Sequence, residues 1–308
     1  MAGTPDVWEP VAGGVAVSIG VFDGVHLGHQ QMLDLLKEEA LTLGSLPVGA
    51  ITFDRHPLTT IDPEKAPPLV STPEERLRLF EAAGLDFAAV LAFDAVTRSL
   101  TPEDFVRSIL SDGLGARLVV VGDGFRFGLD AAGDADELRR LGDHYGFEVL
   151  TVKLLETDSG PISSTLVRRL VLTGDVSGAA DLLGRPFSRA GRVVAGDGRG
   201  AGIGFPTANL DLAPGLLVPA RGVYTAIAHA GGVPVPAVVN IGTRPTFDGV
   251  REVVEAHLLD FDSNLYGQEI TVEFRDRLRS EQRFESVSDL VAQIHRDVEV
   301  ARRQFGLD

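Results

Sequence analysis

Short apolar runs alternate with stretches of helical periodicity through the first half of the chain. Buried strands are expected at residues 15–21, 48–53, 88–93, 118–121 and 148–153. Between them, apolar residues recur three or four positions apart, as at Leu33, Leu36 and Ala40, which predicts helices packed on those strands. Strands that alternate with helices predict an α/β fold with a doubly wound parallel sheet.

The hydrophobic pattern changes near Gly184. Short strands with a period of two residues are expected at 189–195, 222–230, 235–241, 252–260 and 268–275. Regularly spaced strands with no helices between them predict an antiparallel barrel. The last stretch is an amphipathic helix capped by Ser286 or Ser288, with apolar positions at Val291, Ile294, Val298, Ala301 and Phe305. We therefore expect two domains, 1–184 and 185–308.

Composition narrows the classes of function. The chain has 308 residues, enough for about two domains. A formal net charge of −16 argues against nucleic acid as a partner, because phosphate backbones need basic patches. The chain has no cysteine, so disulfides, thiolate catalysis and zinc–thiolate sites are excluded. The sequence presents no basic, apolar leader and no run of about 18 apolar residues, so we expect a cytoplasmic protein that does not span a membrane.

The turn after the first long strand carries the most distinctive chemistry. Residues 18–30 read S-I-G-V-F-D-G-V-H-L-G-H-Q and run from a strand into a helix. A helix N-terminus offers unpaired N–H groups to phosphate, and Gly24 and Gly28 let a large anion approach the backbone. His26 and His29 can donate hydrogen bonds as charge builds on that anion. The turn predicts a nucleotide site.

Polar residues also follow the other strands of the first half. T-F-D-R-H-P places Asp54 and His56 at the carboxyl end of a strand, and G-D-G-F-R-F-G follows the strand that ends at Val121. Ligands of doubly wound sheets bind at these strand ends, so we expect the segments to converge.

A possible polyphosphate clamp lies further along, at P-I-S-S-T-L-V-R-R-L. Ser163, Ser164 or Thr165 can cap a helix there, and Arg168 follows within about one turn. Hydroxyls, free N–H groups and a guanidinium together suit polyphosphate.

In the second half, the candidate chemistry begins in G-D-G-R-G-A-G-I-G-F-P-T-A-N-L, at residues 196–210. The glycines do not form a P-loop, because no G-K-[S/T] follows them. Pro206 fixes the backbone, and Thr207 and Asn209 present neutral oxygens on one side of an extended chain, which suits Mg²⁺ beside nucleotide phosphates. Strand alternation puts Glu255 and His257 on one face, and a carboxylate aimed into the mouth of the barrel could take a proton from an attacking hydroxyl.

These motifs resemble a known family. G-x-F-D-G-x-H-x-G-H-Q and I-S-S-T-x-x-R resemble the flavin adenylyltransferase module of bifunctional bacterial riboflavin kinase/FAD synthetases. G-F-P-T-A-N-L, N-I-G-T-R-P-T-F and L-Y-G resemble riboflavin kinases, which fold as six-stranded barrels. The resemblance covers nearly the whole chain in the right order. It implies that ATP phosphorylates riboflavin to FMN with Mg²⁺, and that a second ATP then adenylylates FMN to FAD with release of pyrophosphate.

The resemblance also implies roles for individual residues. Glu255 would be the kinase base, and His26 and His29 would stabilise the α-phosphate. ATP and its phosphates would contact Gly20, Phe22, Asp23, Gly24, Gly28, Ser164, Thr165, Arg168, Gly198, Arg199, Gly204 and Pro206. Flavin would contact Asp54, His56, Asp123, Phe125 and Phe127. The metal would be held by Thr207 and Asn209.

Three positions depart from the family pattern. Arg55 stands where the family's strand end has proline. Gly124 stands where the family usually has Asp or Asn, and Asp123 is expected to substitute. Ala201 stands at a usually basic position of the Gly-rich loop, so Arg199 is expected to take that role.

Three other functions are consistent with parts of the pattern. The chain could transfer nucleotidyl groups to another phosphate ester and use the barrel only for binding. It could be a kinase alone, with its first domain inactivated at Arg55 and Gly124. It could be a flavin-binding regulator without turnover, which the intact histidine pair and Glu255 disfavour.

Overall fold

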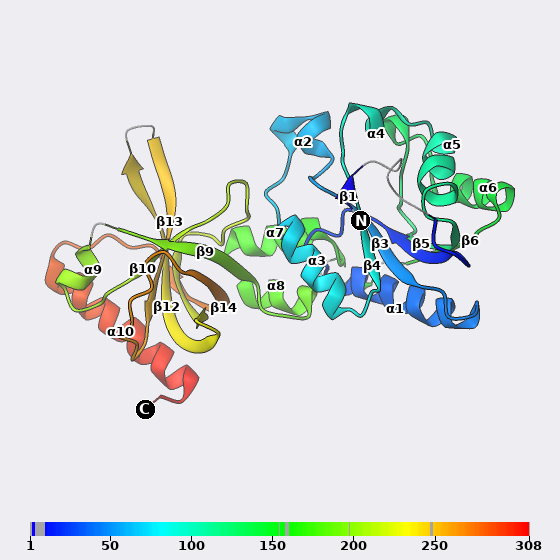
Figure 1. Ribbon diagram of the computed structural model, residues 1–308. Coiled ribbons are helices and arrows are strands. Elements are labelled where there is room, and N and C mark those ends of the chain that lie inside the picture. The colour runs from blue at the N-terminus through cyan, green and yellow to red at the C-terminus, as the bar shows by residue number, and fades with distance from the viewer. Residues whose placement is uncertain are drawn as a thin grey trace. The chain divides into compact units, whose positions relative to one another are not determined.

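The computed structural model describes residues 2–3, 10–153, 155–157, 160–196, 198–246 and 249–307. The chain forms two compact units, Met1–Ser164 and Thr165–Asp308 (Figure 1). A parallel sheet organises the first unit and a closed barrel organises the second.

The sheet of the first unit is parallel throughout. Its strands are β1 (Ala2–Gly3), β2 (Val15–Ile19), β3 (Val48–Phe53), β4 (Phe87–Leu91), β5 (Ala116–Gly122) and β6 (Glu148–Val152). Their spatial order is β1-β4-β3-β2-β5-β6, and every neighbouring pair is parallel. The predicted fold class is confirmed. The strand order reverses between β2 and β5, which makes the carboxyl end of β2 the expected place for a ligand.

Helices connect these strands. They are α1 (Leu27–Thr42), α2 (Leu58–Ile61), η2 (Pro63–Lys65), α3 (Pro73–Ala82), α4 (Ala95–Ser99), α5 (Pro102–Phe105), the π-helical η3 (Val106–Ser111), η4 (Leu129–Ala131) and α6 (Ala135–Tyr145). Thr72 caps α3 in a full capping box with Glu75, and Thr101 caps α5. Both hydroxyls satisfy N–H groups that a helix start leaves unpaired.

Two hydrophobic cores cover the two faces of the sheet. On one face, Val15 and Val17 pack with Ile109 of η3 and Leu138 of α6. On the other face, Ala16 packs with side chains of α1 and α3, which include Leu33, Leu36 and Phe80. Successive residues of a strand point to opposite faces, so β2 contributes to both cores. Burial on both sides explains why its sequence is apolar without alternation.

The chain leaves the sheet through a short hairpin and two helices. These are β7 (Glu156–Thr157), β8 (Gly160–Pro161), α7 (Ser164–Thr173) and α8 (Val176–Leu183). Within the second unit, the backbone N–H of Ala220 donates to the oxygen of Val171, and the Arg277 guanidinium donates to the oxygen of Thr173. The C-terminal end of α7 is therefore anchored to the barrel.

The barrel is closed and antiparallel, as predicted. Its strands are β9 (Ser188–Val194), β10 (Ala208–Asp211), β11 (Gly222–Ala230), β12 (Val233–Thr246), β13 (Gly249–Leu258) and β14 (Glu269–Ser280), in the spatial order β10-β13-β12-β11-β14-β9. β10 is absent from the strands that we read off the alternation. It is only four residues long and follows a proline, so the sequence carries too little periodic signal to reveal it.

One long and one short helix complete the second unit. The short helix, α9 (Arg199–Gly202), lies in the Gly-rich loop, and α10 (Val287–Phe305) closes the chain. Ser286 caps α10, and Val298, Ala301 and Phe305 pack on the barrel, as their spacing predicted. No helix within the described residues is both long and apolar enough to cross a membrane.

Candidate active sites

The phosphate turn, residues 20–26, has a strained backbone. Gly20 still donates its N–H to Ile51 of the neighbouring strand, but Phe22 and Val25 then adopt φ angles of 52° and 40°, with Gly24 at 83°. Positive φ is rare for any residue with a side chain and most unfavourable for a β-branched one such as Val25. Strained backbone persists where surrounding contacts over-determine it, and it is concentrated at functional sites.

Asp23 supplies one set of those contacts. Its carboxylate is buried and accepts hydrogen bonds from the N–H groups of Val70 and Ser71, at 3.0 and 2.9 Å, and from the Ser71 hydroxyl. The same hydroxyl accepts the Gly24 N–H at 2.8 Å. The segment before α3 is thus fastened to the turn. We predicted that Asp23 contacts ATP; the carboxylate bonds seen here are structural, and the ATP contact stays a prediction.

The two histidines of the turn are stacked at the start of α1. Their ring centroids are 3.6 Å apart with an interplanar angle of 17°. His26 is the N-cap, and its Nδ1 accepts the backbone N–H of His29 at 3.3 Å, which leaves the ring proton on Nε2. Burial, and secondarily the neighbouring His26, hold the pKa of His29 well below its ordinary value. His29 is therefore neutral near pH 7, and its buried Nδ1 has no hydrogen-bond partner.

Residues distant in the sequence reach this turn. The Ser164 hydroxyl donates to the backbone oxygen of Asp23 at 2.8 Å. A Cβ on Gly28 would lie 3.3 Å from the His26 ring and 3.5 Å from the oxygen of Ile162, so a side chain there would crowd both. The Ser164 bond brings I-S-S-T to the histidine turn, while the contact of Ser164 with phosphate stays a prediction. Thr165 follows Ser164 on α7, and Arg168 is buried one turn further along the helix.

The residues after β3 are held by the backbone of the next strand. Asp54 accepts the Phe93 N–H at 2.9 Å through Oδ1 and pairs with Arg55 through Oδ2. Burial raises the pKa of Asp54, but the hydrogen bonds from Arg55 and Phe93 outweigh it, so the pKa is lowered overall. His56 accepts the Leu58 N–H through Nδ1. Arg55 is thus an exposed ion-pair partner of Asp54 in this unit.

The segment after β5 divides into core and open surface. Phe127 is buried in the core, where it contacts Phe105, and Phe125 stacks on it with ring centroids 5.5 Å apart. Asp123 is exposed. A Cβ on Gly124 would meet nothing within 4 Å, so the turn has room for the larger residue of the family pattern. Flavin contacts of these residues stay predictions.

Sequence reasoning missed Arg76, which joins the two strand ends. Its side chain is 1% exposed and donates to the backbone oxygens of Val21, at 2.6 Å, and Phe53, at 3.1 Å, and to the Thr52 hydroxyl. Burial lowers the pKa of Arg76. Among the neighbouring carboxylates, Asp23 opposes this shift most strongly. Nothing in T-P-E-E-R reveals this burial, because arginine on a helix is usually exposed.

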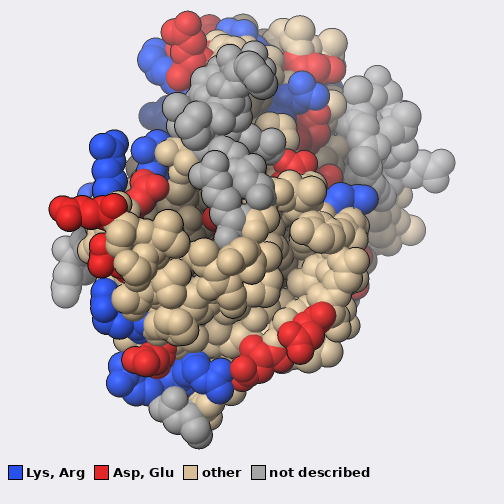
Figure 2. Space-filling view, turned by 90° about the vertical axis from the view of Figure 1, so that its left-hand side faces the viewer, with Lys and Arg blue, Asp and Glu red and all other residues tan. Residues whose placement is uncertain are grey.

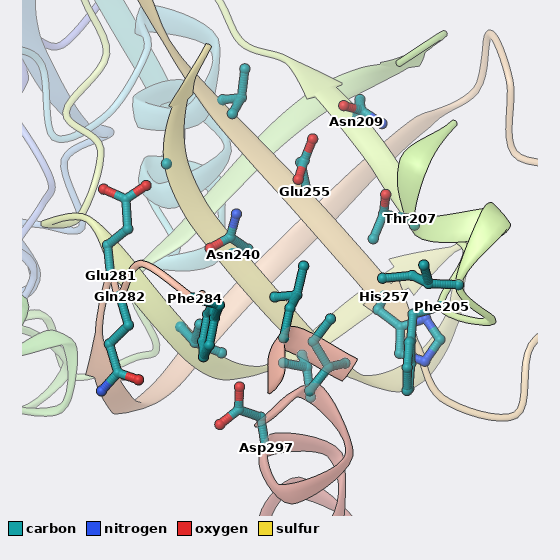
Figure 3. A pocket seen from close by; sticks show the side chains of 18 of the residues that line it. Phe205, Thr207, Asn209, Asn240, Glu255, His257, Glu281, Gln282, Phe284 and Asp297 are labelled. Atoms are coloured by element: carbon teal, nitrogen blue, oxygen red, sulfur yellow. The ribbon is translucent and has the colours of Figure 1, made fainter. Parts of the chain in front are cut away.

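The second unit contains a cavity of about 720 Å³, within the range typical of small-molecule sites. β10, β12 and β13 form one wall, and the segments after β14 and α10 form the opposite side (Figure 3). Figure 2 shows that uncharged residues cover most of the barrel side of the molecule, with acidic and basic side chains gathered toward its borders. Among the described residues, this face has no broad basic surface to hold phosphate.

Three polar side chains form a row across the cavity wall. The strand register pairs Asn209 of β10 with Glu255 of β13, and Glu255 with Asn240 of β12. Paired residues in a sheet point to the same face, so all three enter the cavity, and Figure 3 shows Glu255 between the two amides. Asn240 was not among our predicted site residues, although it opens the N-I-G-T-R-P-T-F segment that resembles riboflavin kinases.

The position of Glu255 corrects one expectation. We expected its carboxylate in the mouth of the barrel. The barrel interior is instead filled by side chains from the other face of these strands, which alternate with Asn240 and Glu255. Examples are Val239, Val254 and Ala256, which are at most 2% exposed. The cavity therefore lies on the outer face of the wall, beside α10. Alternation predicts which residues share a face, but only closure of the barrel decides which face is inside.

The Gly-rich loop packs closely against Thr207. A Cβ on Gly200 would lie 2.4 Å from the oxygen of Phe205 and 3.4 Å from the Thr207 hydroxyl, so the close approach requires glycine. Gly198 and Gly204 have φ angles of 69° and 92°. The side chain of Arg199 lies outside the described residues, so its predicted role stays a prediction.

An ion pair closes the far end of the cavity. Arg279 of β14 donates from Nε and Nη2 to the carboxylate of Asp297 on α10, at 2.8 to 3.1 Å, and Gln293 donates to the same carboxylate. Both charged side chains are mostly buried, and both line the cavity with the ring of Phe284. The pair fixes α10 against the wall that carries Glu255.

Comparisons with known proteins identify the family. The family model described as FAD synthetase matches residues 9–166, and the one described as riboflavin kinase matches residues 183–305. A bifunctional riboflavin kinase/FMN adenylyltransferase of Escherichia coli strain K12 is 41% identical over 295 residues, covering 96% of this chain and 94% of the relative. The Pseudomonas fluorescens protein of that name is also 41% identical, with the same coverage. The Bacillus subtilis protein is 36% identical, covering 94% of this chain and 92% of its own.

A solved structure shares the whole architecture. The crystal structure titled as a macrolide-efflux protein from Streptococcus pneumoniae superposes with a TM-score of 0.89 at 32% identity, covering 97% of each chain. Its title describes that protein and is not carried over to this one. The FAD synthetase match covers the sheet with its histidine turn, and the riboflavin kinase match covers the barrel with its Glu255 cavity. The chain belongs to the bifunctional riboflavin kinase/FMN adenylyltransferase family.

Proposed function

We propose that each unit carries one of the two activities of this family, and that the polar row at Glu255 is the kinase centre. The chain is a riboflavin kinase and FMN adenylyltransferase that uses ATP as co-substrate. In the kinase reaction, the terminal ribityl hydroxyl of riboflavin attacks the γ-phosphorus of ATP, and ADP leaves. Glu255 accepts the hydroxyl proton. Its place between Asn209 and Asn240 on the cavity wall supports this assignment.

The same wall offers ligands for Mg²⁺. Among the described residues, no group of three or more His, Cys, Asp or Glu side chains could hold a metal ion. The neutral oxygens of Thr207 and Asn209, close to one carboxylate, fit Mg²⁺, which keeps few protein ligands and binds mainly through phosphates and water. When bound, the ion would neutralise charge on the phosphates. The rest of catalysis is positioning of the hydroxyl, which the rigid barrel wall supplies.

A second, smaller cavity suits the base of ATP. It measures about 140 Å³ and is lined by Pro206, Ala208, Ala256 and Tyr266, among others. Thr207 lines both cavities. We place adenine in the small cavity and the flavin ring in the large one, so that the phosphates pass Thr207 and reach the hydroxyl beside Glu255.

For adenylyl transfer, we place the α-phosphate of ATP at the histidine turn. The phosphate of FMN attacks the α-phosphorus, and pyrophosphate leaves. His26 and the neutral His29 donate hydrogen bonds to the charge that grows on the α-phosphate. Ser164, Thr165 and Arg168 hold the outer phosphates at the start of α7.

One reaction mixture tests the proposal against its rivals. Riboflavin, ATP and Mg²⁺ should yield FMN and then FAD, resolved by chromatography. FMN that accumulates without FAD would indicate a kinase alone, and no FMN at all would indicate a transferase for another phosphate ester. Flavin binding without ATP turnover would indicate a regulator. The cytoplasmic location, the absence of a nucleic-acid partner and the domain boundary at Gly184 stay predictions.

A further inference from the structure

The segment that leads into Thr207 lies outside the barrel ladders. Register pairing of β10 with β13 begins at Ala208, and pairing with β9 begins at Asn209. Pro206 has no N–H and therefore cannot donate to either neighbour. Residues 205–207 must be positioned by other contacts.

His257 supplies one of those contacts. Its Nδ1 lies 2.8 Å from the backbone oxygen of Pro206. A carbonyl oxygen only accepts, so Nδ1 carries the proton in this bond. His257 follows Glu255 by two residues on β13 and shares its face. One side chain of the catalytic strand thus holds the Pro206 carbonyl, just before the ladder of β10 begins.

A second imidazole lies beside the same segment without making this bond. The ring of Phe205 meets His257 edge-on, with centroids 5.5 Å apart, and meets His295 of α10 edge-on at 4.9 Å. Figure 3 shows Phe205 and His257 side by side at one end of the cavity. Both imidazoles pack against Phe205, but of these two only His257 bonds the Pro206 carbonyl. A comparison of the two residues therefore separates the effect of the hydrogen bond from that of ring packing.

We propose that His257 is a positioning residue of the kinase reaction: by holding the Pro206 carbonyl, it sets where the Thr207 oxygen lies relative to Glu255. The inference rests on the proposed function, in which Thr207 and Asn209 hold the metal-bound phosphates. The Pro206 carbonyl belongs to the peptide that joins Pro206 to Thr207. Fixing it fixes the orientation of Thr207 without any contact between His257 and the metal. Such outer-shell partners commonly change metal affinity by about ten-fold or more when removed.

Three variants separate the hydrogen bond from the ring. His257→Leu removes the donor. His257→Asn keeps an N–H donor at the position of Nδ1, because its amide nitrogen is also two bonds from Cβ. His295→Leu removes the other imidazole from Phe205 and leaves the Pro206 bond intact. Thermal unfolding of each variant establishes that the barrel is folded.

The measurements are kinase rates against Mg²⁺ concentration and hydrogen–deuterium exchange of residues 203–212 with and without Mg²⁺ and ADP. We expect His257→Leu to raise the half-saturating Mg²⁺ concentration about ten-fold, with kcat at saturating Mg²⁺ within about three-fold of wild type. Protection of residues 203–212 by Mg²⁺ and ADP should weaken in parallel. His257→Asn and His295→Leu should stay within about two-fold of wild type on both measurements, because both keep the bond to Pro206.

Two results would overturn the inference. Either His257→Leu matches wild type in Mg²⁺ dependence and protection, or His257→Asn loses as much as His257→Leu. Failure of the proposed function looks different. In that case Mg²⁺ and ADP would leave residues 203–212 unprotected in the wild-type protein itself, whatever the variants do.

Discussion

The two sites of this protein hold their reactive groups by different means. In the sheet unit, the histidines lie on a strained turn in which Phe22 and Val25 have positive φ angles, and buried bonds from Asp23 and Arg76 hold it in place. In the barrel unit, Glu255 lies on a regular strand, and its neighbours are fixed by ladder register. A strained turn depends on distant supports, whereas a register depends on the sheet as a whole. The first site should therefore be sensitive to substitutions outside the reaction centre.

The largest effect is expected at Glu255. Glu255→Gln keeps the shape of the side chain and removes the base, so riboflavin phosphorylation should fall by about 10²- to 10⁴-fold. FAD formation from supplied FMN should be unchanged, because the other unit carries it. Chromatographic rates with riboflavin and with FMN as alternative substrates measure both. Loss of both activities in the folded variant would contradict the assignment of two separate sites.

His29→Ala provides the reciprocal test. Removing one oriented donor to a developing charge costs about 10²- to 10³-fold in rate, so FAD formation from FMN should fall by that factor. FMN formation from riboflavin should persist. Equal loss of FMN formation would show that the turn serves both reactions, and an unchanged FAD rate would remove His29 from the mechanism.

Arg76→Met tests whether the supports of the turn matter. The change leaves the buried oxygens of Val21 and Phe53 without their donor, which should destabilise the sheet unit by about 2–4 kcal/mol. Amide exchange of residues 15–26 should accelerate, and FAD formation should fall while kinase activity remains. Arg78→Met is the matched control, because Arg78 lies on the same helix and is exposed. Equal exchange rates in the two variants would refute the supporting role.

The smallest effect concerns pH. The fold holds the pKa of His29 well below the ordinary 6.5, so below about pH 6.5 the unfolded chain binds a proton that the folded chain does not. Stability should therefore be lost as the pH falls through that value, by up to about 1.4 kcal/mol between pH 7.5 and 5.5. Urea unfolding at both pH values measures it, and His29→Gln should remove this part of the dependence. An identical pH dependence in the variant would assign it to other groups.

Much of both sites followed from local pattern. The strand, turn and helix around His26 and His29 were predicted from apolar runs and glycines, and alternation correctly placed Glu255 and His257 on one face. Two positions that depart from the family's sequence pattern fit the structure without a clash. Arg55 pairs with Asp54, and Gly124 faces open space. Asn240 and Arg76 escaped prediction because their roles depend on partners elsewhere in the fold. Arg76, for example, bonds a carbonyl 55 positions away.

The sequence by itself determined the alternation of strands and helices in the first half, the change from a parallel sheet to a barrel, and the residue types available for phosphate chemistry. These are properties of periodicity and turn composition within a few residues. Only the tertiary structure decided that Asp23 fastens the segment at Ser71, that Arg76 is buried, and that the Glu255 cavity lies on the outer face of the barrel. Burial and hydrogen bonding depend on which distant elements cover a residue, and no local pattern records that.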